Sequence, residues 1–416
     1  MSERAKLILQ ITGFVMVVIL LGWGIWALFF RAPGTSVVPG RVIPVAPGQL
    51  PDVSEGPGGR VVDTTREEQR VLVPEPPPVQ QEPDLVAAGG RTQVASLTPS
   101  RADFNTLASG GMLNYYDERD ERFYRINPTG GAPVLLSDKV FRSVESVAWS
   151  HGGSSAILEF PDGSNIFYDF ERNIQATLPP EAQEFSFSPD DSQLAYEYIG
   201  ESEADRWIIA SSPTGEGQEL VQALGKESRN VNVSWSPTGE VIATYREPTS
   251  GEGEEVFFIG LNDENFLSLQ TNGLGFESAW SPEGKQILYS VYSEATNYNP
   301  MLHIAGGSGD NIGLGNRSLR IQTWPDKCVF AGEEVAYCAV PQSLQEGSGI
   351  FREQSASTPD TIYKIDLINN SASPVAYPES AGASSFTIET MSVSADARTL
   401  YFTDRVSGRI HELRLR

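Results

Sequence analysis

Residues 235–239 read Trp235-Ser236-Pro237-Thr238-Gly239, and this pattern of an aromatic residue, a serine and a tight turn recurs along the chain. Seven residues beyond the aromatic anchor, Ile242 opens a second apolar stretch. An apolar strand ending at the aromatic residue, a turn set by proline and glycine, and a returning strand explain each copy. The other copies are Trp149-Ser150-His151-Gly152-Gly153, Phe187-Ser188-Pro189-Asp190-Asp191, Trp280-Ser281-Pro282-Glu283-Gly284, the degenerate Val393-Ser394-Ala395-Asp396-Ala397, and a shortened copy from Phe330 through Gly332 to Tyr337.

The spacing of these copies indicates the size of the repeating unit. From Trp149 to Trp280 the anchors lie 38, 48 and 45 residues apart, and further strand-like segments follow inside each unit. A period of about 44 residues with four strands per unit is typical of β-propeller blades. An array of immunoglobulin-like sandwiches would need about 100 residues per unit instead. The sequence therefore predicts an all-β propeller.

The repeat also carries a family resemblance. A Trp-Ser-Pro-x-Gly turn followed by a short apolar strand resembles the WD40-like (PD40) repeat of the TolB-like propellers, and the resemblance covers about residues 92–416. It implies a propeller in the bacterial envelope but no particular activity. TolB itself is secreted, whereas the anchor considered below would tether this chain to a membrane.

The two ends of the repeat region indicate the number of blades. The last blade has three strand-like segments, 388–393, 399–403 and 409–413, and lacks an outer strand. Residues 93–97 could supply it, which would close the ring between the two termini and remove an open sheet edge. This arrangement predicts seven blades, with six and eight as the alternatives.

An uncharged stretch near the N-terminus predicts a membrane anchor. Residues 7–30 form a run of 24 residues without a charge. As a helix this run would span roughly 36 Å, which is enough to cross the hydrocarbon core. It is too long for the apolar part of a cleaved signal peptide, so it predicts an uncleaved signal anchor after a short cytoplasmic tail, residues 1–6. Residues 31–90 are rich in proline and glycine and predict a disordered linker before a propeller over 91–416.

Composition narrows the classes of function. The formal net charge of −24, from 54 acidic and 30 basic residues, argues against nucleic acid as a partner because phosphate backbones would be repelled. The three histidines, His151, His303 and His411, do not have the spacing of metal ligands. No nucleophile elbow is present, because Gly306-Gly307-Ser308-Gly309 has the wrong spacing. We therefore expect no enzymatic activity, no cofactor and no metal.

The two cysteines indicate which cellular compartment the propeller occupies. Cys328 and Cys338 flank a turn centred on Glu333, which would place them opposite each other in an antiparallel hairpin. This geometry predicts a disulfide and, with it, an oxidising environment; two buried thiols in the cytoplasm are the alternative. The predicted topology is a single-pass membrane protein with a cytoplasmic N-terminus and an extracytoplasmic propeller.

A partner would bind at the face that carries the long loops. In a four-stranded meander the first turns share one face, and the loops between strands two and three share the opposite face with the blade-to-blade connections. The long segments 199–205, 246–254, 291–300 and 341–360 all belong to the second set. The aromatic and arginine anchors available on this face are Tyr298, Phe351, Arg352 and Phe386. We expect a protein-binding or scaffolding module of the cell envelope; a glycan or peptidoglycan binder is the first alternative, and a propeller lyase or hydrolase the second.

Overall fold

The computed structural model describes residues 82–249 and 252–416. The predicted membrane anchor, 7–30, and nearly all of the predicted linker lie outside these residues. Within the described ranges, no helix is both long enough and apolar enough to span a bilayer.

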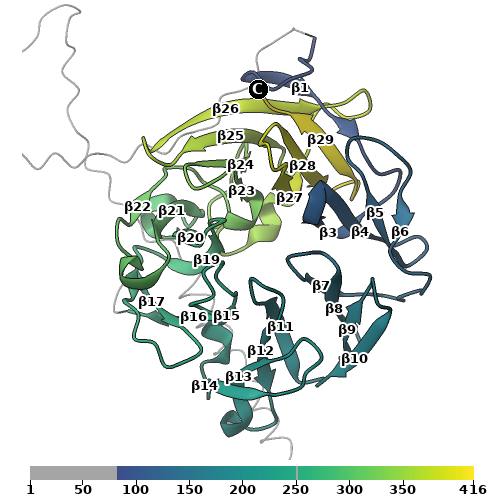
Figure 1. The fold of residues 1–416 in the computed structure, drawn as a ribbon. Helices are drawn as coiled ribbons and strands as arrows, with labels where there is room; N and C mark the ends of the chain where they lie inside the picture. Colours follow the sequence, from purple (N-terminus) through teal and green to yellow (C-terminus); the bar gives the residue numbers. More distant parts are fainter. Residues whose placement is uncertain (1–81, 250–251) are drawn as a thin grey trace, which may run out of the picture. The chain divides into compact units, whose positions relative to one another are not determined.

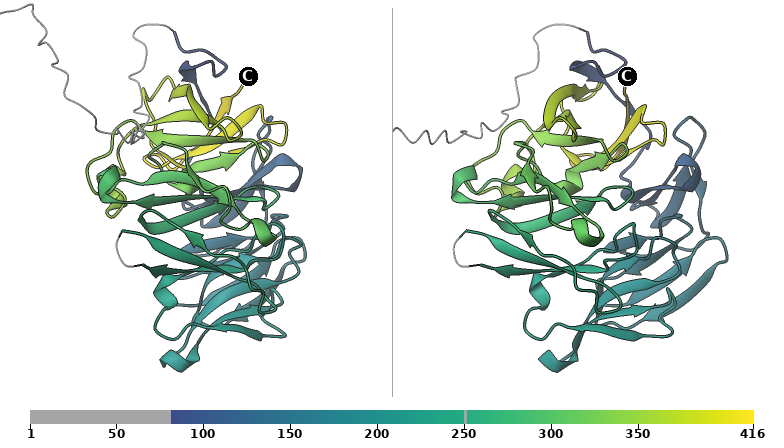
Figure 2. Two further views of the ribbon diagram at one scale, coloured as in Figure 1. Left: turned by 90° about the vertical axis from the view of Figure 1, so that its left-hand side faces the viewer. Right: turned by 60° about the vertical axis from the view of Figure 1, so that its left-hand side comes forward.

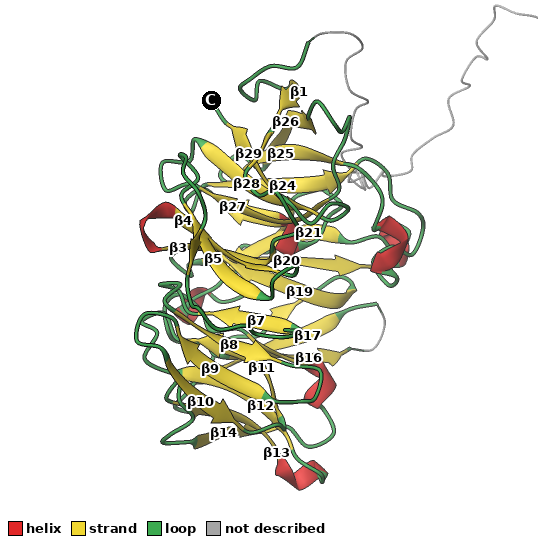
Figure 3. Ribbon diagram, turned by 90° about the vertical axis from the view of Figure 1, so that its right-hand side faces the viewer, coloured by secondary structure: helices red, strands yellow, loops and turns green. Residues whose placement is uncertain are grey.

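Seven antiparallel meanders surround a central channel and form a β-propeller, which confirms the predicted seven-bladed all-β fold (Figure 1). The only helical segments in the described ranges are single 3-10 turns in the connections between strands (Figure 3). Blade one contains β3 (Asp103–Ala108), β4 (Met112–Asp117), β5 (Arg122–Ile126) and β6 (Val134–Leu135), and blade two contains β7 (Ser146–Trp149), β8 (Ser155–Glu159), β9 (Asn165–Asp169) and β10 (Ile174–Leu178). Blade three contains β11 (Ala182–Phe187), β12 (Leu194–Ile199), β13 (Arg206–Ser211) and β14 (Glu219–Ala223), and blade four contains β15 (Val231–Val233), β16 (Ala243–Pro248), β17 (Glu254–Ile259) and β18 (Leu269–Gln270).

The remaining blades follow the same plan. Blade five contains β19 (Leu274–Trp280), β20 (Gln286–Tyr292), β21 (Met301–Gly306) and β22 (Arg317–Ser318). Blade six contains β23 (Cys328–Phe330), β24 (Val335–Pro341), β25 (Asp360–Asp366) and β26 (Ser371–Glu379), and blade seven contains β27 (Ile388–Val393), β28 (Thr399–Asp404) and β29 (Ile410–Arg414). The 3-10 turns are η1 (Ser109–Gly111), η2 (Glu203–Asp205), η3 (Ser228–Asn230), η4 (Glu294–Thr296), η5 (Gly309–Asn311), η6 (Pro325–Lys327) and η7 (Arg352–Ser355).

The repeated serine has a specific role in every turn. In blade four, the Ser236 hydroxyl accepts a hydrogen bond from the backbone N–H of Val241 at 3.0 Å, five residues later. The same bond recurs in the other four pentapeptide copies, at Ser150, Ser188, Ser281 and Ser394. The serine therefore satisfies a backbone group where the second strand begins.

The fifth position of the pentapeptide adopts a left-handed backbone in all five copies. Gly239 has φ +78°, and its N–H donates to the carbonyl of Ser236 at 2.9 Å. Glycine enters this region of φ without steric cost, whereas a side chain pays for it. The equivalent residues, all with positive φ, are Gly153, Asp191, Gly284 and Ala397. The turn therefore favours glycine at this position, and the copies with Asp191 and Ala397 adopt the same backbone at a steric cost.

Each blade buries its apolar faces against its neighbours. In one core cluster, Leu288 and Leu302 of blade five pack with Ala336 and Ile365 of blade six. The buried side chains of adjacent blades interleave in the same way around the ring. A single blade is too thin to bury its own apolar residues, so stability comes from stacking neighbours.

The ring closes through the N-terminal segment of the propeller. β2 (Ala95–Ser96) pairs antiparallel with β29 and supplies the missing outer strand of blade seven. β1 (Gly90–Gln93) pairs parallel with β26 and adds a fifth strand to blade six, which the sequence did not predict. Figure 2 shows these first strands beside the last ones. Ala87 is also buried and packs in the core cluster between blades six and seven, so the packed body includes residues before the predicted boundary at 91.

Candidate functional site

The long loops gather at one face of the propeller. Three of them join the second and third strands of their blades: residues 200–205, 293–300 and 342–359. The pentapeptide turns join the first and second strands, so they lie at the opposite face. The first strand of each blade is the innermost one, next to the channel (Figure 1).

Two of these loops, 293–300 and 342–359, are bonded to each other, and we call them the paired loops. The N–H groups of Gly347 and Gly349 donate to the carbonyls of Asn297 and Tyr298 at 2.9 and 2.8 Å. A side chain at position 349 would collide with Tyr292 and with the Tyr298 carbonyl, both 2.7 Å from the place of its Cβ. Glycine at 349 thus permits a close backbone contact, which holds the two loops in one arrangement.

The paired loops carry an exposed apolar patch. Tyr298 and Phe351, both candidates from the sequence, are 38% and 61% exposed, and Ile350, which directly precedes Phe351, is 47% exposed. Ile350 was missed because a single aliphatic residue in a loop carries no sequence signal. We call Tyr298, Ile350 and Phe351 the apolar patch.

Arg352, the third candidate, anchors the loop instead of standing free. Its guanidinium lies 2.6 Å from a carboxylate oxygen of Asp326 and 3.7 Å from one of Glu277. It also lies 4.8 Å from the ring centre of the buried Trp324. Since Glu277 belongs to β19 and Asp326 to η6, Arg352 ties the paired loops to the wall of the channel.

The prediction for Phe386 was wrong, because this residue does not reach the surface. Its side chain is 4% exposed and belongs to the core cluster that joins blades six and seven. Its ring centre lies 4.7 Å from that of His411 and 5.5 Å from that of Phe402. A loop position gave no indication that the side chain turns inward between two blades.

The channel mouth on the loop face is a charged depression. Three adjoining hollows of about 620, 380 and 520 Å³ surround it; the first two share Asp326 and the last two share Glu184. η6 contacts β19 and β27 and so narrows the opening. The lining carboxylates are Asp103, Glu118, Glu145, Glu159, Glu184, Glu277, Asp326, Glu353 and Glu389, and the lining arginines are Arg101, Arg229, Arg246, Arg352 and Arg405.

Burial raises the pKa of several of these carboxyl groups. The pKa of Asp103 rises to about 6 because the group is desolvated, although the charge of Arg101 opposes the shift. Desolvation also raises the pKa values of Glu159, Glu184 and Glu277. A positively charged group at the mouth would stabilise the ionised carboxylates, so the mouth favours cationic groups.

The backbone of the innermost strands is irregular at this mouth. Glu184 on β11 and Phe104 on β3 have φ of +55° and +50°, and the pairing of both strands shifts register beside them. Such bulges redirect side chains and are frequent near functional sites. Here they lie on strands that contribute carboxylates to the hollows.

The opposite end of the channel is lined by the pentapeptide turns. A hollow of about 480 Å³ there is bordered by His151, Pro189, Pro237 and Pro282. Cys328 lines the same hollow, and a disulfide joins it to Cys338, which lies directly opposite in the β23–β24 pairing.

The histidines lie apart from the loop-face mouth. His303 and His411 are on β21 and β29, and burial lowers the pKa of each. His151 is in a pentapeptide turn and lies 3.2 Å from Asp191. In the described part of the chain, no cluster of three or more potential ligands has the geometry to hold a metal ion.

Comparisons with known proteins establish the fold. No protein-family model matches the sequence, and no curated protein matches it. The chain is similar to the β-propeller domain of Swd1 (Cps50) from Myceliophteria thermophila, with 9% identity over 78% of this chain and 100% of that one and a TM-score of 0.51.

Two further solved structures are similar at TM-scores below 0.5. TolB from Acinetobacter baumannii matches with 12% identity over 65% of this chain and 61% of its own length, at a TM-score of 0.40. An oligogalacturonate lyase in complex with manganese matches with 10% identity over 80% of this chain and 99% of its own, at a TM-score of 0.49. This chain thus spans less than two thirds of TolB. At 9% identity, the similarity to Swd1 shows the propeller fold alone.

Proposed function

We propose that this chain is a membrane-tethered propeller outside the cytoplasm that binds a protein partner of the cell envelope at its loop face. One observation carries the proposal: the apolar patch is exposed on loops that are fixed to each other and clamped to the channel wall. Exposed aromatic side chains on a rigid support are the usual anchors of protein interfaces, since little conformational entropy is lost on binding.

The charge of the face favours a basic partner. Nine carboxylates and five arginines line the hollows beside the apolar patch, and the chain as a whole carries −24. A complementary positive surface would be steered toward the mouth and oriented there. An apolar anchor beside a charged cavity is therefore suited to a partner with an apolar contact next to lysine or arginine.

The location is supported by two features of the sequence and by one of the structure. The uncharged run 7–30 is long enough to cross a membrane, and the proline-rich residues 31–90 provide reach beyond it. A disulfide that joins the chain's two cysteines fits an oxidising compartment.

Photo-crosslinking in intact cells tests the binding face. A photoreactive phenylalanine at position 351 should form a crosslinked species with a partner protein. The same group at Ile368, which is 67% exposed in the turn between β25 and β26, is the matched control on the opposite face. Replacing Tyr298 and Ile350 by serine should abolish the crosslink from position 351. Equal crosslinking from both positions, or none from 351, would contradict the proposal.

A further inference from the structure

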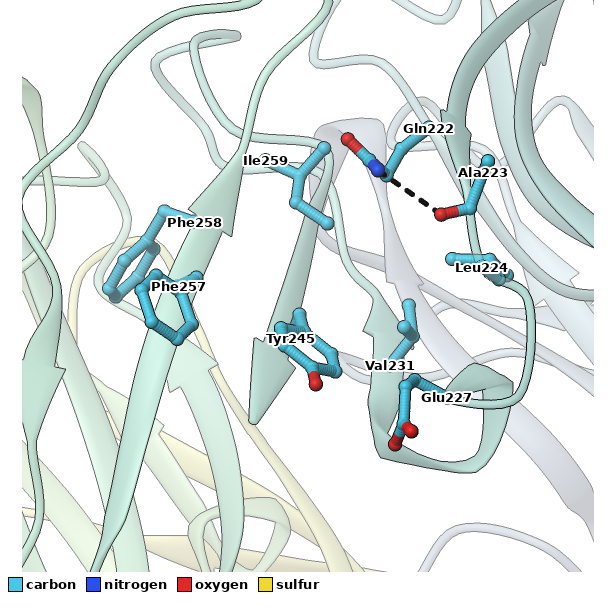
Figure 4. Close-up of a pocket in the computed structure, with 9 residues that line it drawn as sticks. All are labelled: Gln222, Ala223, Leu224, Glu227, Val231, Tyr245, Phe257, Phe258 and Ile259. Atoms are coloured by element: carbon cyan, nitrogen blue, oxygen red, sulfur yellow. Dashed lines mark hydrogen bonds between the residues drawn. The ribbon is translucent and has the colours of Figure 1, made fainter. Parts of the chain in front are cut away.

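A second hollow lies between blades three and four, away from the channel. It has a volume of about 340 Å³ and is lined mainly by apolar side chains, with Leu224, Val231 and Tyr245 among them. Figure 4 shows these side chains turned toward one space, with Glu227 at its edge. We call this space the interblade pocket.

The local structure explains why the blades separate here. β15 has only three residues, and η3 connects it to the end of blade three. On the blade-four side, the rings of Tyr245 and Phe257 are stacked with centres 6.0 Å apart. A wide aromatic pair beside a short strand leaves a space that the neighbouring blade does not fill.

The pocket opens beside a free sheet edge. β14 is the outermost strand of blade three, and in the described chain no strand pairs with its outer side. Its residues Gln222 and Ala223 are exposed and form part of the pocket rim. Exposed edges of this kind accept an extended segment as an additional strand. The structure contains such a case, because β1 pairs with the outer strand of blade six.

The negative charge of Glu227 at the pocket favours extended segments that carry a lysine or arginine. Glu227 is the one charged group among the nine lining residues. Its carboxylate is exposed at the rim and accepts a hydrogen bond from Asn230 at 3.0 Å, which leaves its second oxygen for another donor. Desolvation raises the pKa of Tyr245, and the nearby charges of Glu227 and Glu247 raise it further, so two carboxylates lie close to the aromatic wall of the pocket.

We propose that the interblade pocket docks an extended segment of a partner protein. The segment adds along β14, places an aromatic or branched aliphatic side chain between Leu224 and Tyr245, and sets a neighbouring lysine or arginine beside Glu227. This site is separate from the loop face.

A labelled peptide tests the site on the purified full-length chain. The probe is the capped pentapeptide Val-Lys-Phe-Lys-Val carrying fluorescein, and binding is followed by fluorescence anisotropy. Replacing its phenylalanine by glycine should weaken binding about tenfold or more, because the buried apolar contact is lost. Replacing both lysines by glutamate should weaken it to a similar extent, and methylating the backbone N–H of the phenylalanine tests the strand pairing.

Variants at exposed positions connect the binding to the pocket without disturbing the core. Ala223→Trp should block the pocket and abolish binding, Glu227→Gln should weaken it about threefold, and Ile174→Trp on the exposed outer strand of blade two should leave it unchanged. No peptide binding, equal binding of the lysine and glutamate peptides, or unchanged binding by Ala223→Trp would overturn the proposal. A change in oligomeric state caused by Ala223→Trp would instead assign the pocket to a second copy of the chain, which also overturns it. None of these outcomes affects the crosslinking test at Phe351.

Discussion

The Nζ atom of Lys327 lies 2.7 and 2.8 Å from the two carboxylate oxygens of Asp360, and both side chains are almost completely buried. One of these oxygens also accepts a hydrogen bond from the N–H of Ile388 at 2.7 Å. Lys327 ends η6 and Asp360 opens β25, while Ile388 begins β27. Asp360 therefore connects blade six to η6 through the ion pair and to blade seven through the hydrogen bond from Ile388.

Breaking this ion pair should be costly. Asp360→Ala leaves the Lys327 ammonium buried without a counter-charge, so we expect a loss of about 3–5 kcal/mol in the free energy of unfolding. Urea denaturation followed by tryptophan fluorescence measures it. The matched control is Glu283→Ala, which removes an exposed ion pair with Lys285 and should leave the free energy of unfolding nearly unchanged. Similar losses for both variants would show that the buried pair does not hold the two blades together.

The fifth position of the pentapeptide offers a stabilising substitution. Ala397 has φ +55°, in the place where three other copies carry glycine. Ala397→Gly should raise the free energy of unfolding by about 0.5–1 kcal/mol, since glycine adopts this backbone without a Cβ clash. Ala395→Gly in the same turn is the control and should give no gain. A destabilised Ala397→Gly protein would mean that the methyl group contributes more by packing than the backbone loses by strain.

Glu197 should make stability depend on pH. Its side chain is 1% exposed, and desolvation raises the pKa to about 7. One of its oxygens accepts a hydrogen bond from Gln183 at 3.0 Å, and the other has no protein partner. Because the pKa is higher in the folded than in the unfolded chain, the protonated carboxyl is favoured by folding, and stability falls as the pH rises through about 7.

The variant Glu197→Gln removes this dependence. At about pH 8, the free energy of unfolding of Glu197→Gln should be higher than that of the wild type by at most about 3 kcal/mol. This difference should vanish near pH 4. Glu219→Gln on the exposed strand β14 is the control and should follow the wild type throughout. If the gap between Glu197→Gln and the wild type stays constant with pH, the ionised form of Glu197 is not penalised by burial.

The disulfide should stabilise the propeller, and its presence in cells can show which compartment the propeller faces. Replacing Cys328 and Cys338 by serine removes the crosslink that restricts the unfolded chain. We therefore expect the free energy of unfolding to fall by about 2–3 kcal/mol, and the reduced wild type should behave like the variant. In cells, a maleimide reagent should modify the thiols only after reduction if the propeller faces an oxidising compartment. Modification without reductant in freshly lysed cells would place the propeller in the cytoplasm.

Much of the fold followed from local chemistry. The turn of each pentapeptide depends on a serine hydroxyl that accepts a hydrogen bond from the N–H five residues later, and on a residue with positive φ. Both features lie within a short contiguous stretch, such as Ser236 to Val241. The period of these turns then implies blades, and a blade needs neighbours to bury its faces. The closing strand was predictable too, because an unpaired edge in blade seven required a partner from the other end of the repeat.

The candidate site followed only in part. Tyr298 and Phe351 are on exposed loops as expected, but Phe386 is buried and Arg352 is engaged in ion pairs. The channel-mouth carboxylates come from nine separate positions on different blades, and nothing in the sequence brings Asp103 near Asp326. β1 was missed because its pairing with β26 joins residues almost 290 positions apart, as in Arg91 and Glu379, which are separated by 288.

The sequence by itself determined the repeating hairpin, the seven-blade ring and its closure, because these depend on short-range turn chemistry and on the need to bury a periodic apolar face. Only the tertiary structure decided which loop residues stay exposed, where carboxylates converge and where two blades leave a pocket. Those features depend on contacts between residues far apart in the chain, whose relative positions are set by how whole blades pack and not by any local pattern.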